Sequence, residues 1–114
     1  MRTFSRLLLI SLFQLMIVAI YAQSKSMVTI KVYENYGGCM GPNATNEILI
    51  LSDTDKPEKI ELEKVSSTKD FEANASKVHE TVIKYLNQGY LLVASNTSAW
   101  QCVTQTLYIL TKQK

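Results

Sequence analysis

The chain has 114 residues, of which 46% are hydrophobic and 19% are charged, and its formal net charge is +2. This length suits one small domain with a modest hydrophobic core. Arg2 and Arg6 are the only arginines, so the rest of the chain is close to neutral and lacks the basic patch that nucleic-acid binding requires. The composition therefore argues against a nucleic-acid-binding protein.

The N-terminal residues have the pattern of a signal peptide. The two arginines precede an apolar run, Leu7–Ile20, and the small residue Ala22 follows it. The run is shorter than the ~20 residues of a membrane-spanning helix, and no cysteine near Ala22 offers a site for a lipid. We therefore expect residues 1–22 to be removed, no membrane anchor to remain, and residues 23–114 to form one exported domain, periplasmic or secreted.

Three strands are predicted in the first half of this domain. They span Met27–Tyr33, Glu47–Leu51 and Lys59–Val65. In the first and third, apolar side chains alternate with polar ones, which is typical of strands with one buried face. The glycine-rich segment Tyr36–Asn46 predicts a loop, and Ser52–Pro57 predicts a hairpin connection.

The stretch Asp70–Gly89 predicts an amphipathic helix. Its apolar residues recur every three or four positions, at Phe71, Ala75, Val78, Val82, Tyr85 and Leu86. Side-chain oxygens in Ser66–Thr68 suit the free amides of its first turn. Gly89 is expected to end the helix, with Tyr90 packing back toward Tyr85. Two further strands follow, Tyr90–Ser95 and Val103–Thr111, around a turn at Asn96–Gln101.

The order of these elements predicts an α+β fold with a single, mostly antiparallel five-stranded sheet and one helix across one face. Successive hairpins and a crossover helix place the strands in the spatial order 3-2-1-5-4, with the first strand in the centre. In this arrangement the loop Tyr36–Asn46, the start of the helix and the turn Asn96–Gln101 share one end of the sheet.

Several segments together resemble a group of small uncharacterised exported proteins of Gram-negative bacteria. The matching pieces are Ala22-Gln23 at the end of the leader, Val28–Glu34, Ile60–Glu63, and Gly89–Ser95 after the helix. The resemblance covers most of residues 23–114. It implies the fold and the exported location, and it implies no activity, cofactor or catalytic residue.

Cys39 and Cys102 are the only cysteines, and in an exported chain two cysteines most often pair. The strand order places both at the same end of the sheet, so we expect a Cys39–Cys102 disulfide. The alternative is a reactive thiol that works with His79, the only histidine, in a small secreted hydrolase or thiol enzyme.

No pattern of metal ligands or cofactor-binding residues stands out. Asp53 and Asp55 are read as turn residues, since calcium would need further oxygen ligands. The sequons at Asn43, Asn74 and Asn96 are read as coincidental in a chain rich in serine and threonine. We therefore expect no catalytic residue, metal or cofactor.

Two surfaces are candidates for binding a partner. Leu49, Leu51, Tyr108 and Leu110, with Leu91 or Leu92, are expected on the sheet face away from the helix, where a second copy of the chain could pack. Tyr36, Met40 and Trp100 lie in loops at the end of the sheet where the two cysteines are expected, and they are the predicted partner-binding residues. The sequence thus favours a non-enzymatic binding module for an unknown protein or envelope component.

Overall fold

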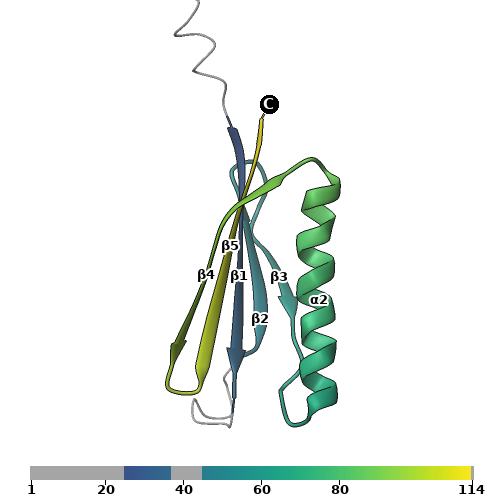
Figure 1. Cartoon of the computed structure of the whole chain (residues 1–114), viewed down its shortest axis with the longest axis vertical. Coiled ribbons are helices and arrows are strands. Elements are labelled where there is room, and N and C mark those ends of the chain that lie inside the picture. The colour runs from purple at the N-terminus through teal and green to yellow at the C-terminus, as the bar shows by residue number, and fades with distance from the viewer. Residues whose placement is uncertain (1–24, 37–44, 114) are drawn as a thin grey trace, which may run out of the picture.

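The computed structural model describes residues 25–36 and 45–113. Five antiparallel strands form one sheet in the order β3-β2-β1-β5-β4, and one helix lies against it (Figure 1). The elements are β1 (Lys25–Asn35), β2 (Glu47–Ser52), β3 (Glu58–Glu61), α2 (Thr68–Asn87), β4 (Leu91–Trp100) and β5 (Val103–Gln113). The α+β prediction and the predicted strand order are both confirmed.

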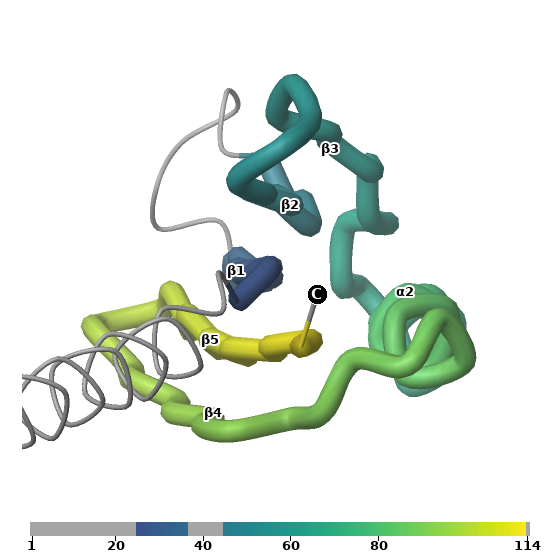
Figure 2. The backbone as a smooth tube through the Cα atoms, turned by 90° about the horizontal axis from the view of Figure 1, so that it is seen from above, coloured from purple at the N-terminus to yellow at the C-terminus, as the bar shows by residue number. Residues whose placement is uncertain are grey.

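The first strand forms the centre of the sheet. Three alternate residues of β1 face α2 and are almost completely buried, namely Val28, Ile30 and Val32. Viewed from above, the helix lies to one side of the sheet (Figure 2). The two edge strands of the sheet are β3 and β4. The hydrophobic core therefore forms between the helix and the face that β1 shares with its neighbours.

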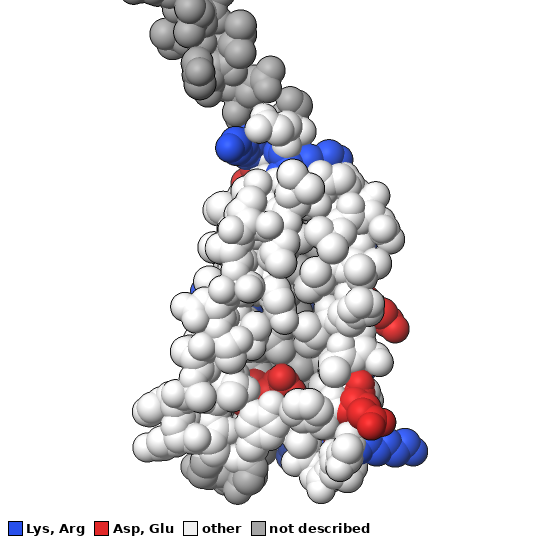
Figure 3. Space-filling model, viewed as in Figure 1, with Lys and Arg blue, Asp and Glu red and all other residues white. Residues whose placement is uncertain are grey.

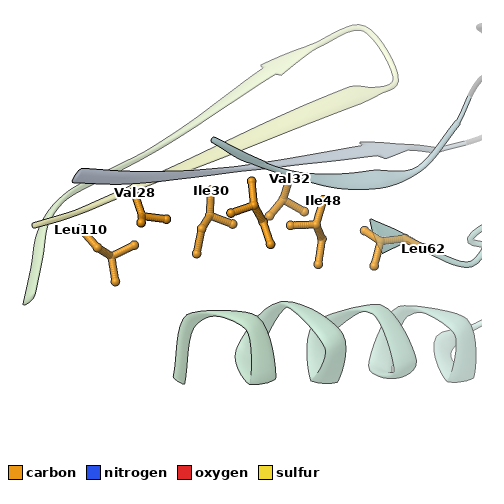
Figure 4. Close-up of a cluster of buried hydrophobic side chains, with 7 residues drawn as sticks. Val28, Ile30, Val32, Ile48, Leu62 and Leu110 are labelled. Atoms are coloured by element: carbon orange, nitrogen blue, oxygen red, sulfur yellow. The ribbon is translucent and has the colours of Figure 1, made fainter. Parts of the chain in front are cut away.

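The core is small and comes mostly from the three central strands. Its members point from the sheet toward the helix (Figure 4). They are Val28, Ile30, Val32, Ile48, Ile50, Leu62 and Leu110. Burying a side chain of this kind contributes about 1.5–3 kcal/mol, so these seven residues are the main apolar contribution to stability.

The prediction that Tyr108 and Leu110 point away from the helix is wrong. Leu110 pairs with Val28 and Tyr108 pairs with Ile30, so both share the face of these core residues. Leu110 is fully buried and Tyr108 packs against the core. Leu107–Leu110 of β5 are all apolar or aromatic, so both faces of the strand carry such side chains. The sequence pattern alone therefore does not show which face is buried.

The ends of α2 follow the predicted capping pattern. The Ser67 hydroxyl accepts a hydrogen bond from the Asp70 amide, and the Asp70 carboxylate accepts from the backbone of Ser67. Hydrogen bonds from Ser66 and Ser67 hold the pKa of Asp70 below its usual value. At the other end Gly89 has φ 88°, a conformation that glycine adopts without a steric penalty.

After this cap the Tyr90 amide donates to the Tyr85 carbonyl at 3.1 Å, and the two rings meet edge to face at 5.6 Å. The predicted return of Tyr90 onto Tyr85 is thus confirmed. The contact fixes the direction in which the chain leaves α2 for β4.

The buried side of α2 differs from the predicted stripe. Val78, Val82 and Tyr85 pack against the core as expected. Phe71 is 47% exposed, however, and the most buried helical side chains are polar ones, Asn74 and Thr81. The Thr81 hydroxyl donates to the Lys77 carbonyl at 2.7 Å, so its burial leaves no unsatisfied donor.

Two connections differ from the prediction. β4 continues to Trp100, so Asn96–Trp100 is strand and the turn is reduced to Gln101 and Cys102. β3 ends earlier than predicted, at Glu61. The residues after it make hydrogen bonds with the loop before β2 and with α2 instead of with a neighbouring strand.

In the part of the chain that the structure describes, no helix combines the length and apolar character needed to cross a membrane. The predicted signal peptide, residues 1–22, lies outside the described residues. Its removal remains a prediction.

Candidate functional site

Three segments meet at the end of the sheet that carries Cys102, as the strand order predicts. The amide of Tyr36 donates to the carbonyl of Cys102 at 2.7 Å, which joins the end of β1 to the turn between β4 and β5. Tyr36 also forms a bridge with Val65, and its ring lies 6.3 Å from that of Phe71. We call this region, Tyr36, Val65, Phe71 and Trp100–Cys102, the cysteine end.

A buried polar cluster holds the start of the helix at this end. The side chain of Asn74 is fully buried, and it accepts from the Glu63 amide at 2.8 Å and donates to the Glu63 carbonyl at 2.9 Å. Asn46 donates to the same carbonyl at 2.9 Å and accepts from the Asn35 amide at 2.8 Å. Asn46 and Asn74 thus pair with backbone groups as a neighbouring strand would, and connect β1, the segment after β3 and α2.

The structure separates two of the predicted partner-binding residues. Tyr36 faces the helix, where its ring meets Phe71 and its hydroxyl interacts with Thr104 and Glu34. Trp100 pairs with Val103 and belongs to the opposite face of the sheet. It is 65% exposed. Tyr36 and Trp100 therefore share one end of the molecule but not one surface.

Met40 and Cys39 lie outside the described residues. Cys102 is half-buried in the turn after β4. Tyr36, hydrogen-bonded to the Cys102 backbone, precedes Cys39 by a stretch that spans at most about 11 Å. A Cys39–Cys102 disulfide is compatible with this short connection and remains a prediction.

The sheet face opposite α2, which we call the open face, carries a row of apolar side chains. Its apolar members include Met27 from β1, Leu49 and Leu51 from β2, Val103, Leu107 and Ile109 from β5, and Leu91, Ala94 and Trp100 from β4. Leu91 is 69% exposed. Of the described helices and strands, none covers this face (Figure 2). The face is therefore a candidate surface for a macromolecular partner.

A cleft of about 340 Å³ lies on the other side, between α2 and the strands β1 and β5. It is lined by Val32, Glu34, Ala75, Val78, His79, Val82, Thr106 and Tyr108. Among the described residues that line it, the ionisable side chains are Glu34, His79 and Tyr108. Burial is the main reason that the pKa of the adjacent Tyr36 hydroxyl is raised, and the charge of Glu34 adds to it.

Of the residues of the predicted thiol enzyme that the structure describes, the cleft includes His79 and not Cys102. Cys102 is not among its lining residues, and His79 is exposed on the helix. Within residues 25–36 and 45–113, no group of three histidine, cysteine or acidic side chains is placed to bind a metal ion.

The asparagines of the described sequons, Asn74 and Asn96, differ in how far they are exposed. Asn74 is buried and uses its amide in hydrogen bonds, so a glycan there is incompatible with the folded helix. Asn96 lies in β4, on an exposed strand. Asn43 lies outside the described residues.

Comparisons with known proteins find no matching family model, no matching curated protein and no matching solved structure. A function for this chain is therefore inferred from the chemistry of its own surfaces.

Proposed function

We propose that the protein is an exported, non-enzymatic binding module that engages another protein of the cell envelope through its open face. The observation that carries the proposal is the position of Trp100. This side chain is 65% exposed and stands on the same face as the uncovered apolar residues of β2 and β5. Tryptophan is among the residues that contribute most to protein interfaces.

The scaffold under this surface is well suited to binding. Leu49 and Leu107 flank Lys31 of β1 across the sheet. Lys59 of β3 pairs with Leu49 on the same face, so the apolar residues lie beside a few charged ones. Backbone pairing on both sides of β1 keeps these side chains in one arrangement. Residues held in place before binding lose little conformational entropy when a partner docks.

The alternative, a small hydrolase or thiol enzyme that uses Cys39 or Cys102 with His79, has less support. His79 lines the cleft under the helix, whereas Cys102 lies in the turn beyond β4. A free-thiol assay on native protein distinguishes the two functions, because a thiol enzyme needs a free cysteine.

The proposal predicts that Trp100→Ala weakens partner binding at least about 30-fold, as expected for a residue of this type at an interface, with little change in melting temperature. Tagged protein captures partners from the envelope of the producing cell, and the affinity of a purified partner is then measured for wild type and variant. Leu51→Lys, which adds a charge in the same face, is expected to have a similar effect.

Ser76→Lys is the matched control, because it adds the same charge at an exposed position of α2. It should bind as wild type does. A partner that binds Trp100→Ala and Leu51→Lys as tightly as wild type would exclude the open face as the binding surface.

A further inference from the structure

The two edges of the sheet differ in a way that concerns pairing with another strand. β4 is a long edge strand, Leu91–Trp100, and it is exposed along its whole length. Its sequence, LLVASNTSAW, contains no charged residue and no proline. Figure 3 shows a broad uncharged surface on the side of the molecule where β4 lies. Proteins usually protect an exposed edge with charges, proline or short length, and β4 has none of these protections.

The other edge, β3, is protected. It is only four residues long, Glu58–Glu61, and three of these residues are charged. Pro57 precedes it. In addition, the Lys77 ammonium donates to the Glu61 carbonyl at 3.1 Å, and Lys84 lies 3.8 Å from the Glu58 carboxylate. Side chains of α2 thus occupy or screen groups with which a further strand would have to pair.

The register of β4 indicates which of its backbone groups are unused. Trp100 and Val103 flank a two-residue turn, and the residues that flank such a turn exchange hydrogen bonds with each other. Alternation along the strand then directs the amides and carbonyls of Ser95, Thr97 and Ala99 away from β5. No described strand pairs with them. An added antiparallel strand can pair with such a row of backbone groups at this spacing.

We propose that a second copy of this chain pairs with the β4 edge, antiparallel and about a two-fold axis at Thr97. This interface goes beyond the proposed function, because the edge and the open face are separate surfaces. About this axis Thr97 lies opposite Thr97 of the second copy and Ser95 lies opposite Ala99. On the open face Trp100 lies opposite Ala94, so a large side chain meets a small one. All these pairs are uncharged, and no like charges oppose each other.

Self-pairing is favoured over a foreign strand because β4 carries no charge that would select a partner of opposite sign. An antiparallel strand that pairs with itself also closes a symmetric dimer. Each copy then presents only its protected β3 edge, so the assembly stops at two chains. The dimer has one continuous ten-stranded sheet, twice the five strands of one chain, with both open faces on the same side.

Sedimentation velocity of the exported domain across the micromolar range tests the proposal. Wild type should form a concentration-dependent dimer. Thr97→Pro removes an amide that β5 does not use, and Thr97→Lys places two like charges opposite each other. Each should weaken self-association at least about tenfold. Thr97→Val keeps the backbone amide and the shape of the side chain and should leave the dimer intact.

Leu51→Lys should also leave the dimer intact, because it alters the open face and not the edge. Amide exchange gives a second measurement that does not require variants: the Ser95, Thr97 and Ala99 amides should become protected as wild type is concentrated. A monomer at all concentrations would overturn the proposal, as would a dimer that Leu51→Lys disperses and Thr97→Pro does not. Protection of these amides in dilute monomer would overturn it too, because the chain would then cover its own edge.

Discussion

Asn74→Ala is expected to lower the free energy of unfolding by about 2–3 kcal/mol, a large share of the stability of a small domain. The Asn74 side chain is fully buried and makes two hydrogen bonds to the backbone of Glu63. Alanine leaves the Glu63 amide without its acceptor and leaves a gap where α2 meets the segment after β3. Urea denaturation followed by circular dichroism measures the change.

Ser76→Ala is the matched control for this substitution. Ser76 lies in the same part of α2 but is exposed, and alanine there slightly favours the helix. Its stability should equal or slightly exceed that of wild type. If Asn74→Ala cost no more than about 0.5 kcal/mol, the size of an ordinary surface substitution, the hydrogen-bonded cluster would not be what holds the start of the helix.

Cys102→Ser is expected to lower stability by about 4 kcal/mol, the chain-entropy cost of losing a disulfide that closes a loop of this length. The contact between the Tyr36 amide and the Cys102 carbonyl holds the residue three positions before Cys39 beside Cys102. Peptide mapping without reduction should recover the Cys39 and Cys102 peptides joined, and thermal melts with and without reductant should differ.

The double variant tests whether the two cysteines act as one bridge. Cys39→Ser, Cys102→Ser and the double substitution should lose nearly the same stability, because each removes the same bond. Two thiols that react with an alkylating agent in native exported protein would contradict the disulfide.

The fold was largely predictable because the first and third strands alternate clearly and the order of the elements limits the topology. The alternation around Val28 to Val32 identifies the central strand, and Gly89 marks the end of the helix. The face of β5 was not predictable, since Leu107 and Ile109 are as apolar as Tyr108 and Leu110. The register in which β5 pairs with β1 determines which side chains of β5 face the helix. The sequence of β5 alone does not predict that register.

The end of β4 was mistaken for a turn for a different reason. Asn96 and Ser98 are typical turn residues, but in an edge strand with little buried surface polar residues are tolerated. Trp100 is therefore the last residue of β4 and not a loop residue, and it lies on the open face. The exposure of Trp100 agrees with its predicted role in binding. The face on which it lies was not predictable, because that face follows from a turn of only two residues, which pairs Trp100 with Val103.

The sequon at Asn74 does not predict that this side chain is buried and hydrogen-bonded. A usable signal was present: the helical stripe from Phe71 to Val78 passes through position 74, three residues after one and four before the other. An asparagine at such a position has low helix propensity. A buried polar residue in an apolar stripe requires hydrogen-bond partners, although the sequence alone does not identify Glu63 as that partner.

The most direct test of the central claim, that Trp100 stands on an exposed binding surface, is the fluorescence of this single tryptophan. The measurement uses oxidised protein at concentrations where it sediments as a monomer, with and without the purified partner. We predict red-shifted emission that iodide quenches readily in the free protein, and a blue shift with loss of quenching when the partner binds. Blue-shifted emission that resists iodide in the free monomer would contradict the account, because Trp100 would then be buried within its own chain.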